Sequence, residues 1–173
     1  AVAILEAAGV DIVSLNGRTV LNTDEGDIYG EYDLIIRDED GKLTMWDIKS
    51  ASRFAFEHKF KSYEAMKNGD SFGYVSQLFG YTLAERKNYP DIQVGGWIAI
   101  NKETGEMKVC AADPADETEY QQKIIDTVKR YKAADNDNFK REFTDEEETW
   151  YKKPTGNRKL SGTCTFCDYR FTC

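Results

Sequence analysis

Residues 28–50, with the sequence IYGEYDLIIRDEDGKLTMWDIKS, are the most informative segment of the chain. Two runs rich in β-branched and aromatic residues, 28–37 and 42–50, flank the turn-forming sequence Asp38-Glu-Asp-Gly41. A connection this short joins antiparallel neighbours. The segment therefore predicts a pair of antiparallel strands.

Three charged side chains of this segment are expected to gather on one face of the strand pair. Antiparallel pairing brings Asp33 close to Asp47, and alternation along a strand places Lys49 on the same face as Asp47. Two carboxylates beside a lysine suit Mg²⁺ or Mn²⁺, with the carbonyl of Ile48 as a further ligand. A bound cation makes water a better nucleophile, and the lysine would stabilise a phosphoryl transition state. The alternative is a surface hairpin with ordinary charged residues, because Asp-x-Lys is common by chance.

The remaining chain predicts strands and helices in alternation. Asn16-Gly17 indicates a hairpin between short strands at 11–15 and 18–22, because both central positions of such a turn need positive φ. Asp113-Pro114 indicates the start of a helix. The other expected elements are helices over 1–9, 54–67 and 70–88, strands over 92–100 and 106–112, and a polar loop over 134–148. This order predicts an α/β or α+β sheet with helices packed against it.

Length and composition exclude several classes of protein. A chain of 173 residues with 40% hydrophobic and 13% aromatic residues suits one folded domain rather than a disordered chain. No apolar run approaches the roughly 20 residues of a membrane span, and the first ten residues do not resemble a signal peptide, so a cytoplasmic location is expected.

The charge is unevenly distributed. The net charge of −8 disfavours a nucleic-acid partner, because phosphate binding usually leaves a basic footprint. However, residues 24–47 have a balance of −7, whereas residues 149–173 have a balance of +4. One region could hold cations and the other could meet an anion, although solvated charged faces are the ordinary explanation.

Two further groups of residues have spacings that suggest chemistry. Gln77 and Tyr81 lie four apart on a predicted helix and so share a face, which suits either a nucleic-acid contact or ordinary packing. Cys164, Cys167 and Cys173 lie within ten residues, which favours a metal or iron–sulfur site over a disulfide, since three cysteines cannot pair evenly.

The ordered set Gly30-Glu-Tyr-Asp33, Asp47-Ile-Lys49, Gln77-Leu-Phe-Gly-Tyr81 and Cys-x2-Cys-x5-Cys resembles the PD-(D/E)xK nuclease superfamily in its RecB-like branch. It is most similar to the CRISPR-associated RecB-like exonucleases with a C-terminal cysteine cluster and to their phage relatives. The resemblance departs from that branch at Tyr32, where proline is common.

The resemblance implies a restriction-endonuclease-like α/β core over residues 1–150, with a mixed sheet flanked by helices, and a cysteine-rich tail over 151–173. It implies that Asp33 and Asp47 bind the catalytic metal, that Lys49 is the catalytic lysine, and that Gln77 and Tyr81 organise the site and contact DNA. It also implies that the three tail cysteines are ligands of a [4Fe–4S] cluster. The fourth ligand is not apparent, so an N-terminal segment that precedes this sequence, an incomplete cluster or a different metal such as zinc all remain open.

The expected activity is that of a metal-dependent DNA exonuclease acting on DNA ends or single strands. Recombination or CRISPR-type proteins are expected partners, and no membrane is involved. The alternative is a catalytically inactive nuclease-fold module for DNA binding or assembly, with the metal–cysteine tail as a structural staple. The basic residues expected to guide the DNA backbone are Arg53, Lys59, Lys61, Lys152, Lys153, Arg158 and Lys159.

Overall fold

The computed structural model describes residues 1–70, 72–134 and 144–165. The chain divides into two compact units, Ala1–Lys132 and Ala133–Cys173. None of the described helices is both long enough and apolar enough to cross a membrane.

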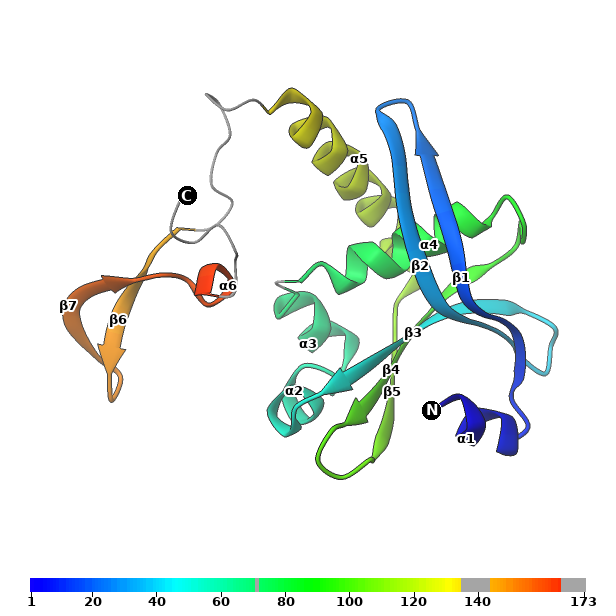
Figure 1. Ribbon diagram of the computed structural model, residues 1–173, viewed down its shortest axis with the longest axis horizontal. Helices are drawn as coiled ribbons and strands as arrows, with labels where there is room; N and C mark the ends of the chain where they lie inside the picture. The colour runs from blue at the N-terminus through cyan, green and yellow to red at the C-terminus, as the bar shows by residue number, and fades with distance from the viewer. Residues whose placement is uncertain (71, 135–143, 166–173) are drawn as a thin grey trace. The chain divides into compact units, whose positions relative to one another are not determined.

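The first unit contains a five-stranded sheet in the order β1-β2-β3-β4-β5 (Figure 1). The β3 and β4 strands pair in parallel and the other neighbours pair antiparallel, so the sheet is mixed, as expected. The strands are β1 (Asp11–Thr23), β2 (Gly26–Arg37), β3 (Leu43–Ala51), β4 (Gln93–Asn101) and β5 (Met107–Ala111). The helices are α1 (Val2–Ala7), α2 (Arg53–His58), α3 (Tyr63–Asn68), α4 (Tyr74–Glu85), the 3-10 turn η1 (Pro114–Asp116) and α5 (Glu117–Ala133).

The turn between β2 and β3 forms as the sequence predicts. The Asp38 carboxylate accepts hydrogen bonds from the backbone N–H groups of Asp40 and Lys42 at 3.0 and 2.8 Å, and Gly41 adopts a positive φ of 82°. These bonds satisfy the backbone of the turn and fix the register of the strand pair, with Leu34 opposite Trp46.

The prediction of a hairpin at Asn16-Gly17 is wrong. Asn16 has the positive φ that the pattern indicates, 51°, but it lies inside the continuous strand β1. Gly17 pairs with Tyr32, whose ring lies so close that a Cβ on residue 17 would be 2.1 Å from it. The glycine therefore makes room for a core side chain, and the hairpin turn is at residues 24–25 instead.

The expected helix over 54–67 is two helices in the structure. Ser52 and Ser62 each accept a hydrogen bond from the backbone N–H three residues later, so each begins a helix of its own, α2 or α3. Phe60, between the two helices, is 3% exposed and packs into the core. Asp113 caps the turn before α5 through the Ala115 N–H at 2.9 Å, which confirms that helix start.

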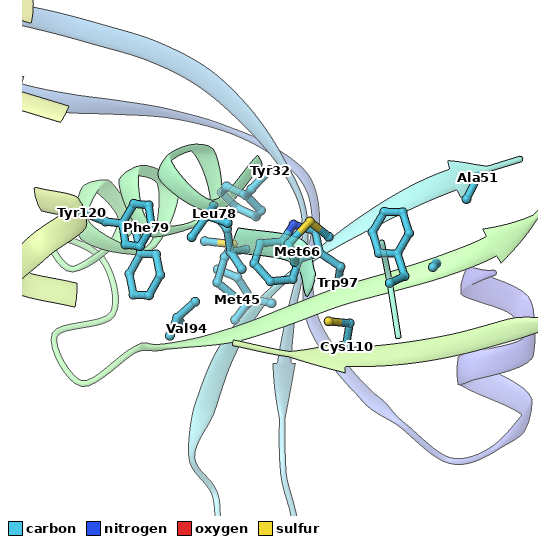
Figure 2. Close-up of a cluster of buried hydrophobic side chains, with 14 of the residues drawn as sticks. Tyr32, Met45, Ala51, Met66, Leu78, Phe79, Val94, Trp97, Cys110 and Tyr120 are labelled. Atoms are coloured by element: carbon cyan, nitrogen blue, oxygen red, sulfur yellow. The ribbon is translucent and has the colours of Figure 1, made fainter. Parts of the chain in front are cut away.

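The core lies between the sheet and its helices, with α4 packed across β1, β2, β3 and β4 (Figure 1). Figure 2 shows the cluster of buried side chains, among which Trp97 of β4 and Phe79 of α4 are fully buried. Phe79 stacks on Tyr120 of α5 with ring centroids 5.1 Å apart, so α5 is held against α4. Cys110 is also buried here, which confirms its expected place in the core.

The second unit contains the hairpin β6 (Glu146–Trp150) and β7 (Lys153–Lys159) and the short helix α6 (Gly162–Thr165). The loop expected over 134–148 therefore gives way to a strand at Glu146. Tyr151 and Lys152 form the turn between β6 and β7, with positive φ values of 47° and 64°. Every residue of β7 is exposed, and no apolar alternation marks these strands in the sequence.

Candidate functional site

Asp33 and Asp47 lie beside each other on the neighbouring strands β2 and β3. The register that pairs Leu34 with Trp46 brings the two carboxylates to the next position along the ladder. The Oδ2 atom of Asp33 accepts a hydrogen bond from the backbone N–H of Ile48 at 2.5 Å. The expected proximity of the two carboxylates is therefore confirmed, and Asp33 is tied to the backbone of β3.

Lys49 joins the carboxylates from the same strand. Its Nζ atom lies 2.8 Å from Oδ2 of Asp47 and donates a hydrogen bond to Oε1 of Gln77 at 3.2 Å. The same ammonium group lies 4.6 Å from the ring centroid of Tyr74, at the start of α4. Three partners thus hold Lys49, whose side chain is 20% exposed, beside Asp47.

Gln77 and Tyr81 extend this series along α4. The Nε2 atom of Gln77 donates a hydrogen bond to the Tyr81 hydroxyl at 2.9 Å, so the side chains of Asp47, Lys49, Gln77 and Tyr81 form one connected chain. Tyr81 in turn packs on Gly30 of β2, where a Cβ would lie 2.2 Å from the tyrosine ring. The close approach of helix and strand depends on this glycine.

Helix α4 is fixed at its beginning by Asp70. The Asp70 carboxylate accepts hydrogen bonds from the backbone N–H groups of Tyr74 and Val75 at 2.7 and 2.9 Å. A carboxylate at this end also interacts favourably with the helix dipole. The helix that carries Gln77 is therefore anchored both at its first turn and against β2.

Asp47 is the most strongly perturbed acid of the site. It is 5% exposed, and burial raises the pKa of its carboxyl from 3.8 to about 6, while Lys49 opposes this shift and Asp33 adds to it. Apart from the ion pair with Lys49, its Oδ2 atom has no hydrogen-bond partner among the described residues. A buried carboxylate oxygen in this state is suited to a cation.

The residues fit a hard divalent cation. Mg²⁺ takes oxygen donors and uses only one or two protein carboxylates, with water and substrate phosphate as its other ligands. Asp33, Asp47 and the backbone carbonyl of Ile48 are donors of this kind. Within the described ranges, no group of three or more His, Cys, Asp or Glu side chains comes together.

Three of the basic residues expected to contact DNA belong to the first unit, and of these Lys59 has contacts that connect it to the site. Its ammonium lies 4.3 Å from the ring centroid of Tyr74, the ring that Lys49 also approaches, and 5.6 Å from that of Phe72. Burial lowers the pKa of Lys59. Arg53 instead pairs with Glu57 at 2.9 Å. Lys61 is exposed.

The other four basic residues expected to contact DNA belong to the second unit. Lys152, Lys153, Arg158 and Lys159 are all exposed on the β6–β7 hairpin. Arg158 pairs with Asp145, with its Nε atom 2.6 Å from a carboxylate oxygen.

Of the three tail cysteines, only Cys164 is among the described residues. It lies half-buried on α6, and its backbone N–H donates to the Ser161 hydroxyl at 3.3 Å. Cys167 and Cys173 lie outside the described residues.

A comparison of the sequence with protein-family models adds an independent finding. The model of the PD-(D/E)XK nuclease superfamily matches residues 4–173. The chain belongs to this superfamily. Members of this superfamily are nucleases that typically use divalent metals, and the carboxylates of Asp33 and Asp47 are donors of the kind that such a metal takes.

A comparison with solved structures also finds similar chains. The chain is similar to a solved structure titled "Crystal structure of SSO0001", with 15% sequence identity, a TM-score of 0.37, and coverage of 72% of this chain. The match covers 54% of that structure's chain, so the present chain spans about half of its length. No curated protein matches the present chain.

Tyr74 and Gly30 are the site residues whose contacts the sequence does not indicate. Tyr74 is in contact with both Lys49 and Lys59, and Gly30 receives the ring of Tyr81. Both contacts depend on where α4 crosses the sheet, and no spacing in the sequence specifies that crossing.

Proposed function

We propose that this protein is a Mg²⁺- or Mn²⁺-dependent DNA nuclease, an exonuclease acting on DNA ends or single strands. The observation that carries the proposal is the convergence of Asp33, Asp47 and Lys49 on one face of the β2–β3 pair, in a chain of the PD-(D/E)XK superfamily. The RecB-like branch is supported by the spacing of Gln77 and Tyr81 and by the tail cysteines.

Each residue of the site has a defined task in this proposal. Asp33, Asp47 and the Ile48 carbonyl would hold the cation, which supplies Lewis-acid polarisation of the phosphodiester and lowers the pKa of water when bound. Lys49 donates hydrogen bonds toward the phosphate oxygens, where negative charge increases in the transition state. Gln77, 3.2 Å from the ammonium, orients Lys49, and Tyr81 orients Gln77.

Lys59 and its aromatic neighbours are suited to the incoming strand. Phe72 is 63% exposed and stacks near Tyr74 with ring centroids 5.8 Å apart, next to the Lys59 ammonium. Exposed aromatic rings stack on unpaired bases, and a neighbouring cation attracts the phosphate backbone. Lys59 and Phe72 would therefore guide a single strand toward Lys49.

A nuclease assay on end-labelled single-stranded and duplex DNA with Mg²⁺ or Mn²⁺ tests the activity. Lys49→Ala and Asp47→Ala should each lower cleavage by at least about a hundredfold, because each removes a group that stabilises the transition state or binds the metal. Circular single strands should resist cleavage if the enzyme requires an end.

The exposed Lys102 in the β4–β5 turn provides the control, and Lys102→Ala should cleave as well as the wild type. Equal cleavage by the wild type, Lys49→Ala and Asp47→Ala would reject the site. A wild type that binds DNA but never cleaves it would favour the nuclease-fold binding module.

For the tail, we propose a [4Fe–4S] cluster with Cys164, Cys167 and Cys173 as three of its ligands. The support is the spacing of these three cysteines within ten residues, whereas the remaining cysteine of the sequence, Cys110, is buried in the core of the first unit. Anaerobic purification should give a brown protein with about four irons per chain, and Cys167→Ser should lose them. A colourless protein loaded with zinc would refute the cluster.

A further inference from the structure

A pocket of about 410 Å³ opens beside the candidate metal site, between the β1–β2 hairpin, α4 and α5. Its volume lies in the range of roughly 300–1,000 Å³ that is typical of small-molecule sites. Gln77 and Tyr81 line it. The same two side chains connect to Lys49, so the pocket and the candidate metal site share a wall.

The lining of this pocket is uncharged. Among the described residues that line it, none is Lys, Arg, Asp, Glu or His, and small residues of α4, such as Ser76, Gly80 and Ala84, leave it open. An isolated phosphate would find no cation among these lining residues. The pocket is therefore suited to a neutral, largely apolar group.

One residue of the lining has a buried polar atom without a partner. This residue of β1 lines the pocket and is 3% exposed, yet its hydroxyl has no hydrogen-bond partner among the described residues. Buried polar groups are normally paired. The Thr19 hydroxyl departs from this rule in the ligand-free chain.

Aromatic surface is available at the rim. Tyr29 of β2 lines the pocket and is 76% exposed, so one face of its ring is open to a flat partner. Such a ring stacks on any of the four bases, because every base has a π-face.

We propose that this pocket binds one unstacked nucleobase of the strand whose phosphate lies at Asp33, Asp47 and Lys49. A nucleobase is flat, neutral and edged with donors and acceptors, and it is tethered to the charged group that the neighbouring site would receive. The inference rests on the proposed nuclease function and deepens it. The substrate at the point of cleavage is a single strand or a frayed end, because a paired base would first have to be extruded.

Matched threonine substitutions on α5 test the pocket. Thr127→Trp places a large side chain into the lining, whereas Thr118→Trp places one on an exposed part of the same helix. Thr127→Trp should weaken binding of a single-stranded oligonucleotide in metal-free buffer by about tenfold or more, and Thr118→Trp should not. Tyr29→Ala should also weaken binding, and Tyr29→Phe should restore it.

Abasic substrates provide the second readout. In the wild type, one abasic nucleotide at a defined position should slow cleavage by about tenfold or more, and Thr127→Trp should abolish that discrimination. Cleavage that depends on Lys49 but ignores both the abasic nucleotide and Thr127→Trp would overturn the base pocket and leave the nuclease intact.

If no cleavage depends on Lys49, the proposed function fails, and the binding experiment alone decides the pocket. Weaker binding by Thr127→Trp than by Thr118→Trp would still support a nucleobase site. Equal binding by the two variants, or capture of an uncharged apolar compound in place of the oligonucleotide, would overturn it.

Discussion

Asp47 combines two properties that oppose each other in a protein without a bound cation. Its carboxylate is buried at 5% exposure, which disfavours the charged form, but one lysine at 2.8 Å favours that form. Burial is the larger effect, and the pKa rises to about 6. Raised carboxyl pKa values of this kind are typical of functional sites, because a bound cation stabilises the buried negative charge.

Asp47→Asn should stabilise the metal-free protein at neutral pH. Because the folded pKa, about 6, is above the ordinary value of 3.8, the unfolded chain ionises more readily, and stability falls as pH rises from about 4 to 6. At about 1.4 kcal/mol per pH unit the penalty above pH 6 is about 3 kcal/mol. The variant should melt at a higher temperature than the wild type at pH 7.5 and at a similar temperature near pH 4.

Thermal melts with chelator and with Mn²⁺ measure this effect. Mn²⁺ should stabilise the wild type and leave Asp47→Asn unchanged. A variant that melts below the wild type at pH 7.5 in chelator would show that Lys49 outweighs burial.

At the level of helices and strands, the sequence indicates elements whose patterns are local. The strands β2 and β3, their turn at 38–41 and the start of α5 follow from alternation and capping residues within a few positions. Asn16-Gly17 misleads because Asn16 keeps its positive φ inside the continuous strand β1, while Gly17 makes room for the ring of Tyr32, its partner on β2. The β6–β7 hairpin is missed because it has no buried face.

The same distinction applies to the candidate site. Asp33, Asp47 and Lys49 come from two adjacent strands, so alternation and a short turn suffice to bring them together. Tyr74 reaches Lys49 only because α4 crosses the sheet at one particular place. Packing of Tyr81 on Gly30 sets that crossing, and no local pattern encodes it.

Gly30→Ala should displace α4 from β2. The added methyl would lie 2.2 Å from the Tyr81 ring, so the ring or the helix must move. Overpacking of this kind costs about 1–3 kcal/mol, and it should also lower cleavage because Gln77 moves with the helix. Chemical denaturation and the nuclease assay measure the two effects.

A second substitution distinguishes this clash from other effects of alanine. Gly30→Ala combined with Tyr81→Ala should be more stable than the sum of the two single changes predicts, because the smaller side chain leaves room for the methyl. Additive losses would show that the ring does not determine the spacing. Gly162→Ala, where a Cβ meets no atom of the described residues within 4 Å, is the neutral control.

The net charge of −8 is a property of the whole chain, whereas the charged residues around the candidate site are arranged in a way that suits an anionic substrate. Two of the acids, Asp33 and Asp47, are proposed metal ligands, and others are exposed, with Glu31 paired to Arg18 at 2.9 Å. Basic groups lie beside these acids at Lys49 and Lys59 of the first unit, and others are exposed on the β6–β7 hairpin of the second unit.

The salt dependence of DNA binding should report whether the second unit takes part. Each phosphate contact on a single strand contributes about −0.7 to the slope of log K against log salt concentration. The triple change Lys152→Ala, Lys153→Ala and Lys159→Ala should make the slope shallower by about 2 if each lysine contacts one phosphate. A slope that matches that of Lys102→Ala would show that the hairpin does not contact DNA.

The parallel pairing of β3 with β4 affects the order in which the parts of the candidate site come together during folding. Asp33 and Asp47 are separated by a short turn, so the two carboxylates can meet as soon as a local hairpin closes. Lys49, however, pairs with Ala99, and this contact closes a loop that contains α2, α3 and α4. We expect the hairpin to form early and the parallel pair late, so that Gln77 and Tyr81 reach Lys49 only in the last stage of folding. Partly folded chains would then hold the carboxylates without the groups that complete the site, and cleavage activity would measure the fully folded population.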